Sequence, residues 1–160
     1  MENAKWYLGS KLVCAWPAVR YQRSVDNKYE YAKEGDIIPE GAHDFEDGYR
    51  VQYEDGYCSW SPKTVFERSY RPTTGLSFGL AIEAMKMGSA VARSGWNGKE
   101  MFLYYVPANE YAATTDIAIK YFGDTVPYGG YIAIKTMQGN VVPWLASQTD
   151  MLADDWYIAG

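Results

Sequence analysis

Apolar positions in the second half of the chain first follow a helical period. Between Phe78 and Met85 they recur at i, i+3, i+4 and i+7, which places them on one face of a helix. Ser77 precedes this stretch and can cap its free amides, whereas Gly88 follows it and favours helix termination. The pattern predicts one amphipathic helix whose apolar stripe belongs to a core.

Two hairpin patterns follow this helix. Residues 90–106 turn at Asn97-Gly98, a pair typical of tight two-residue turns, and residues 131–144 turn at Gln138-Gly139-Asn140. The pattern of the segment between them, residues 107–124, is too weak to assign. One helix followed by consecutive hairpins predicts an α+β fold in which the helix packs across an antiparallel sheet.

A closing tract, residues 141–156, ends the second half. Ser147 and Thr149 can each cap a short helical turn, and residues 155–158 favour a final strand. Most of the tract is polar or aromatic, which suits either a loop or the wall of a binding site.

The first half predicts a small β-rich module. Aromatic positions alternate over residues 49–60 on both sides of the turn Glu54-Asp55-Gly56, which predicts a hairpin, and Ser61 is expected to cap a short helix that begins at Pro62. Proline, glycine and two threonines separate this helix from the next one. We therefore divide the chain into a module over residues 1–71 and an α+β domain over residues 76–160.

Composition and charge narrow the possible functions. The chain has 15 Tyr and 6 Trp among 160 residues, which excludes disorder and suits both binding surfaces and sheets. The net charge is −5 and no basic stripe is present, so duplex nucleic acid is not an expected partner. The sequence contains no signal peptide and no long apolar run, and its two cysteines suit reduced thiols, which predicts a cytoplasmic protein without membrane contact.

Residues that could carry out catalysis are scarce. The single histidine, His43, lies in an acidic loop without a nearby serine or thiol, so a catalytic triad has little support. Asp154 and Asp155 are neighbours that would point to opposite faces of a strand, where solvation or capping explains them better than acid–base work. The domain has neither the histidines of a two-metal site nor a glycine-rich phosphate loop. We therefore predict no catalytic residue, no metal and no cofactor.

The remaining polar and aromatic residues form a set suited to recognition. Aromatic rings can stack on bases, arginine can pair with phosphate, and amide, hydroxyl and carboxylate groups can bind base or ribose edges. The candidate ligand-binding residues are Arg93, Trp96, Asn97, Phe102, Tyr104, Trp144, Ser147, Gln148, Thr149 and Asp150. Each also has a structural explanation, because the tryptophans suit a core, Asn97 suits its turn, and Ser147 and Thr149 suit caps.

These residues lie in motifs that resemble a known family. The motifs are Ser77-Phe78-Gly79, Val91-Ala92-Arg93, Gly95-Trp96-Asn97-Gly98, Met101-Phe102, Val142-Pro143-Trp144 and the long run from Ala146 to Trp156. Over residues 76–158 the chain resembles the Thoeris anti-defence two family of phage and prophage proteins. The resemblance is specific because the motif order and the closing tract agree together.

The resemblance implies a function without catalysis. It implies a homo-oligomeric sponge, typically a tetramer, that binds cyclic ADP-ribose signals such as glycocyclic ADP-ribose and holds them uncleaved in the cytoplasm of the infected bacterial host. Cyclic di- or trinucleotides are further ligands that it implies for some members. Two alternatives from other classes stay open: a phage structural or toxin-like module that binds another protein, and a cyclic-nucleotide hydrolase.

The first module lies outside this resemblance. Its segments Tyr49-Arg50-Val51 and Ser59-Trp60-Ser61-Pro62-Lys63 resemble a small module common in phage proteins. Assisting oligomerisation and adding a second binding surface are both compatible with its sequence.

Overall fold

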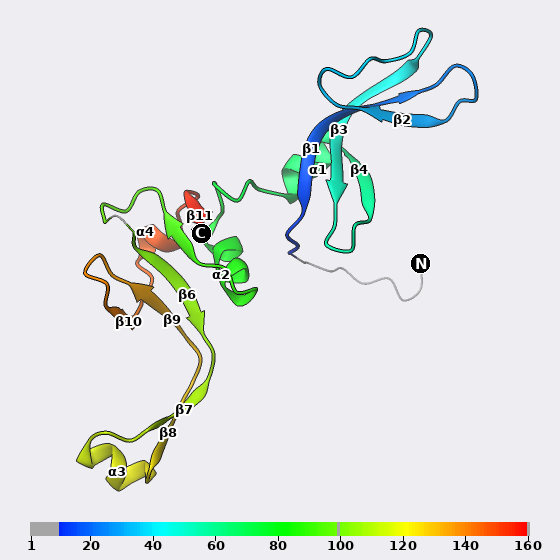
Figure 1. Cartoon of the computed structure of the whole chain (residues 1–160). Coiled ribbons are helices and arrows are strands. Elements are labelled where there is room, and N and C mark those ends of the chain that lie inside the picture. Colours follow the sequence, from blue (N-terminus) through cyan, green and yellow to red (C-terminus); the bar gives the residue numbers. More distant parts are fainter. Residues whose placement is uncertain (1–9, 99, 160) are drawn as a thin grey trace, which may run out of the picture. The chain divides into compact units, whose positions relative to one another are not determined.

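The computed structural model describes residues 10–98 and 100–159, and it divides the chain into two compact units, Met1–Arg71 and Pro72–Gly160 (Figure 1). The predicted module and domain also include residues 1–9, 99 and 160, which lie outside the described part.

The N-terminal unit is an antiparallel four-stranded sheet with the order β2-β1-β3-β4, followed by one short helix. Its elements are β1 (Cys14–Gln22), β2 (Tyr29–Ala32), β3 (His43–Gln52), β4 (Cys58–Pro62) and α1 (Lys63–Ser69). The predicted hairpin is confirmed as β3 and β4, with Gly56 at φ 82° in the turn, a conformation that glycine adopts without steric cost. The predicted cap is wrong: Ser61 is part of β4, Pro62 occupies the capping position, and it contributes no side-chain hydrogen bond.

An arginine and two aromatic rings stack on one face of this sheet. The Arg20 guanidinium lies 4.3 Å from the ring centroids of both Tyr29 and Trp60. Gly48 lies beneath the Trp60 ring, because a Cβ on Gly48 would come within 2.6 Å of a ring carbon and 2.3 Å of the Ser61 carbonyl oxygen. On the opposite face Phe66 of α1 stacks on Tyr49, with ring centroids 4.2 Å apart. Aromatic packing therefore covers both faces of a small sheet.

The C-terminal unit contains an antiparallel five-stranded sheet with the order β10-β9-β6-β5-β11. The strands are β5 (Val91–Arg93), β6 (Phe102–Val106), β9 (Tyr131–Lys135), β10 (Val141–Pro143) and β11 (Trp156–Ile158). The hairpin predicted over residues 131–144 and the final strand predicted over residues 155–158 are confirmed as β9–β10 and β11.

Helix α2 (Phe78–Lys86) packs on this sheet and contributes to its core. Its Ala81 and Met85 are buried against Val91, Leu103 and Trp156. The predicted cap is confirmed, since the Ser77 side chain accepts a hydrogen bond from the Leu80 amide. The predicted α+β architecture, a helix across an antiparallel sheet of hairpins preceded by a β-rich part, is thus observed.

The hairpin predicted over residues 90–106 differs from its prediction in its turn. Strand β5 ends at Arg93, and an irregular segment leads to β6. Positive φ occurs at Glu100, whereas neither Asn97 nor Gly98 has the positive φ that a tight Asn-Gly turn requires. The expectation of a two-residue turn is therefore wrong.

The segment that the sequence left open forms an arm. It contains β7 (Asn109–Ala112), α3 (Asp116–Phe122) and β8 (Thr125–Tyr128). β7 and β8 pair only with each other in the described part of the chain, and none of the residues in these three elements is buried. Figure 1 shows the arm extending from the ends of β6 and β9, with α3 at its far end.

Candidate functional site

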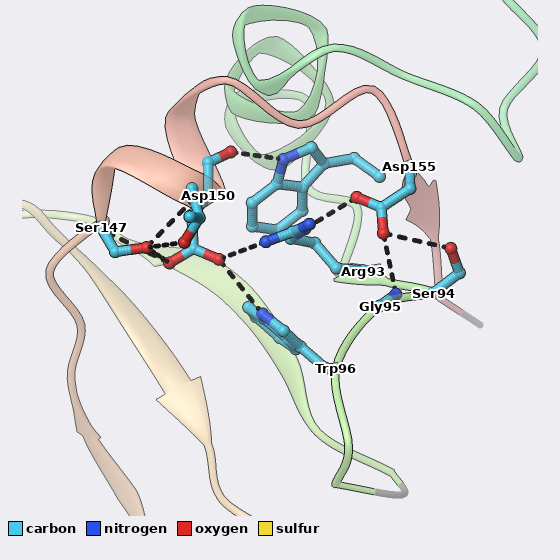
Figure 2. A network of polar contacts seen from close by, with 9 residues as sticks. Arg93, Ser94, Gly95, Trp96, Ser147, Asp150 and Asp155 are labelled. Atoms are coloured by element: carbon cyan, nitrogen blue, oxygen red, sulfur yellow. Dashed lines mark hydrogen bonds and ion pairs between the residues drawn. The ribbon is translucent and has the colours of Figure 1, made fainter.

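Arg93, at the end of β5, joins two segments of the closing tract. Its Nη1 donates to Asp150 Oδ1 at 2.9 Å and its Nε donates to Asp155 Oδ1 at 2.7 Å (Figure 2). The Arg93 and Asp150 side chains are only 16% and 13% exposed. Both ion pairs are therefore partly shielded from water, where charge-assisted hydrogen bonds are stronger than at an open surface.

Asp150 belongs to the one-turn helix α4 (Gln148–Met151). Ser147 caps this helix through a reciprocal capping box: its hydroxyl accepts from the Asp150 amide, and Asp150 Oδ2 accepts from the Ser147 amide at 3.1 Å. Trp96 Nε1 donates to Asp150 Oδ1 at 3.3 Å, and Trp156 Nε1 donates to the Asp150 carbonyl at 3.0 Å. A single residue thus connects the cap, Arg93 and two tryptophans.

Asp155, just before β11, holds the segment after β5. Its Oδ2 accepts from the Gly95 amide at 2.8 Å and from the Ser94 hydroxyl at 3.2 Å. A Cβ on Gly95 would come within 2.8 Å of the same oxygen, so the close approach requires glycine. These bonds explain why β5 ends at Arg93 and why the chain does not continue as a strand to Asn97.

The electrostatics of this network keep both carboxylates ionised. Burial raises the pKa of Asp150, but hydrogen bonds from Ser147, Arg93 and Trp96 outweigh it and lower that pKa to about 2. The hydrogen bond from Arg93 is the main cause of a lowered pKa at Asp155, and both carboxylates raise the pKa of Arg93. Neither aspartate is therefore suited to donate a proton near neutral pH.

The tryptophans of the candidate set pack on the core beside this network. Trp156 is fully buried, and its ring centroid lies 5.5 Å from Trp96 and 6.0 Å from Trp144 in edge-to-face geometry. Trp96 and Trp144 themselves lie 6.3 Å apart and remain partly exposed. The rings of Trp96 and Trp144 therefore contribute to the core and still present some surface to solvent.

The structure brings together five members of the predicted set: Arg93, Trp96, Trp144, Ser147 and Asp150. Thr149 adjoins them, with its hydroxyl 2.8 Å from that of Ser147, and Gln148 is exposed on the same turn.

Three other members lie elsewhere. Asn97 is exposed in the segment that leads to β6. Phe102 and Tyr104 lie on the sheet face opposite α2, because Leu103 between them points into the core and neighbouring strand residues alternate. Their rings lie 6.1 Å apart, and they do not join the Arg93 network.

Sequence reasoning missed Asp155 and Trp156, which organise this site. The only sequence signal was charge: Arg93, the one arginine among residues 76–160, ends the domain's first strand and needs an acidic partner if it is buried. No group of three or more metal-ligating side chains occurs within residues 10–98 and 100–159. Likewise, among the helices that the structure describes, none is long and apolar enough to cross a membrane.

Fold and site together define a small α+β domain that presents tryptophan rings and a capped turn, both held by one ion-pair network. Residues 76–159 match the family model described as "Tad2-like: Thoeris anti-defense 2-like domain". The chain is also 41% identical over 85 residues to "Thoeris anti-defense 2" of Bacillus phage SP01, an alignment that covers 53% of this chain and 96% of that protein. The chain therefore belongs to the Thoeris anti-defense 2-like family, and its N-terminal unit lies outside the match.

Proposed function

We propose that this protein is an anti-defence sponge that binds cyclic ADP-ribose-type immune signals, such as glycocyclic ADP-ribose, and holds them uncleaved. The observation that carries the proposal is the network of Arg93, Asp150 and Asp155, which holds the partly exposed Trp96 beside the Ser147 turn, with Trp144 packed against it. A rigid site loses little conformational freedom when a ligand binds, and this favours tight binding. Family membership supports an anti-defence role, and this role would be exercised in the cytoplasm of an infected host.

The chemistry of the site fits a nucleotide more closely than a protein segment. Tryptophan rings stack on bases, and the hydroxyls of Ser147 and Thr149 can bind ribose or phosphate oxygens. Only part of the Arg93 guanidinium is available to bind a ligand, since its Nε and Nη1 already donate to carboxylates. Its Nη2 forms no hydrogen bond with a residue in the described part of the chain, so this is the nitrogen that we assign to a ligand.

Recovery of the signal tests the proposal. Purified protein is mixed with glycocyclic ADP-ribose, the free signal is measured, and the protein is then denatured by heat. We expect the free signal to disappear and to return intact after heating. A cleaved product would instead identify a hydrolase, and a free signal that never falls would favour a protein-interaction module.

A matched pair of variants locates the site. Gln148→Ala removes an exposed amide from α4 without touching the Arg93 network, and we expect weaker binding by roughly five- to tenfold, about 1 kcal/mol or slightly more. Gln138→Ala makes the same change in the turn between β9 and β10 and should bind like the parent protein. Equal binding by both variants would place the ligand away from α4.

The proposal includes a homo-oligomer, with a tetramer as the expected state. The arm exposes large apolar side chains, and a two-stranded ribbon is at best marginally stable without a covering surface. The exposed residues are Tyr111, Ile117, Ile119, Tyr121, Phe122 and Tyr128. We assign a second copy of the chain as the cover. Light scattering should give a mass of several chains for the parent and a smaller mass for Ile119→Asp, whereas an unchanged mass would contradict this assignment.

A further inference from the structure

A cavity of about 410 Å³ lies in the N-terminal unit, at the end of β2 and beside the first residue of α1. Its apolar lining comes from Pro17, Val19 and Ala32 on the sheet, together with Ile38 on the loop after β2. This volume falls within the range of protein pockets that hold a ligand. The unit lies outside the family match, so the proposed sponge function assigns it no role.

Charges of both signs surround the cavity. Lys33 and Lys63 contribute two ammonium groups, and Glu34 and Asp47 contribute two carboxylates. All four residues are exposed, and none forms an ion pair with another residue that the structure describes. Such a rim suits a partner that also carries equal numbers of both charges. A second copy of the same surface meets this requirement, because each lysine can face a carboxylate across a two-fold axis.

The loop after β2 also carries an apolar side chain that does not line the cavity. Ile37 is 95% exposed, although its neighbour Ile38 lines the cavity. The turn is fixed on one side by Gly35 at φ 89° and by the Asp36 carboxylate, which accepts a hydrogen bond from the Lys33 amide. Ile37 is therefore held away from its own cavity and directed to solvent.

We propose that the cavity receives Ile37 from a second copy of this chain, in a two-fold contact in which each copy inserts one isoleucine and accepts one. An isologous contact requires the inserting group and the receiving cavity on one patch, and the loop of residues 33–38 meets this requirement because it carries Ile37 and also lines part of the cavity. The contact area is small, so the N-terminal units associate weakly by themselves. Any oligomer formed by the C-terminal unit raises their effective concentration.

Photo-crosslinking in the full chain tests this contact. A benzophenone amino acid replaces Ile37, and heavy-nitrogen-labelled protein is mixed with unlabelled protein at a concentration on the order of 100 µM, as suits a weak interface. We expect crosslinked peptides that join residue 37 of one copy to the segment around Val19 or Lys63 of the other. Mixed isotope labels identify them as contacts between chains.

The benzophenone amino acid placed at position 25 provides the control. Val25 is 91% exposed in the turn between β1 and β2, and it does not line the cavity, so it should give few crosslinks between chains. The proposal is wrong if the products from position 37 carry a single isotope label, or if positions 25 and 37 crosslink alike. A small molecule that copurifies in the cavity, detected by native mass spectrometry, would also overturn it. Signal recovery measured on the same samples reports separately on the sponge function.

Discussion

Arg20 in the N-terminal unit and Arg93 in the C-terminal unit are both partly buried, but they contact their surroundings with different parts of the guanidinium group. Arg20 presents its flat faces to Tyr29 and Trp60 and forms one ion pair, with Glu46 at 2.6 Å. Arg93 uses its edge, where Nε and Nη1 bind two carboxylates from a segment more than fifty residues away. Arg20 thus combines stacking with one ion pair, whereas Arg93 is held by two ion pairs.

The difference follows from what each unit has available for a core. The C-terminal unit places a helix over its sheet and buries Trp156 fully, so its arginine is free to join the closing tract to the sheet. The N-terminal sheet carries Arg20 and Trp60 on a face where side chains themselves form the cover. We therefore expect the stability of the C-terminal unit to depend on buried packing and on ion pairs. The stability of the N-terminal unit should depend on the planar groups that stack on its sheet.

Replacing one tryptophan in each unit should give the largest effect. Trp156→Ala removes a fully buried ring and should cost about 3–5 kcal/mol of the unfolding free energy of the C-terminal unit. Trp60→Ala removes a half-buried ring and should cost the N-terminal unit less than half of that. Hydrogen exchange measured on peptides from each unit reports the two losses separately. Equal losses would show that stacking on Arg20 stabilises as strongly as burial in a core.

Local patterns predicted most of this fold. Helix α2 and the hairpins β3–β4 and β9–β10 follow from apolar spacing and turn residues close in sequence. The Asn97-Gly98 turn failed because Asp155 binds Gly95 and Ser94 from sixty residues away. A pattern of local residues contains no information on such a contact. The arm was unassigned for another reason: without a buried face, it has no apolar period to detect.

The candidate site was predicted in part. Residues that share the closing tract with Ser147 were found because they are polar and contiguous, and Trp96 and Trp144 because aromatic residues suit binding. Phe102 and Tyr104 are separate from this group because they occupy the opposite face of β6. Alternation along one strand shows that they share a face, but it does not show which face of the sheet the candidate site occupies. Ligand binding by these residues remains a prediction.

The next largest effect should come from lowering the pH, which should destabilise the C-terminal unit through Asp150. The folded-state pKa of Asp150 lies near 2, below its ordinary value of 3.8, so its contribution is fully present above pH 3.8 and is lost as the pH falls toward 2. This shift corresponds to roughly 2 kcal/mol. Hydrogen exchange in C-terminal peptides should therefore accelerate in this range, and Asp150→Asn should flatten the pH dependence. Asp154→Asn, a change at an exposed carboxylate outside the network, should leave it intact.

The smallest effect should come from removing the stacking of Arg20 on the rings of Tyr29 and Trp60. Arg20→Lys keeps the charge beside Glu46 but replaces a planar group with an ammonium that cannot stack between Tyr29 and Trp60. We expect a loss of about 1 kcal/mol in the N-terminal unit, the size of a partly exposed cation–π contact. Arg23→Lys makes the same change at a residue that forms ion pairs with Asp26 and Glu30 and stacks on no ring within the described part of the chain, and it should cost less. If urea unfolding gives the same midpoint for both variants, the pairing with Glu46, and not the stacking, holds Arg20 in place.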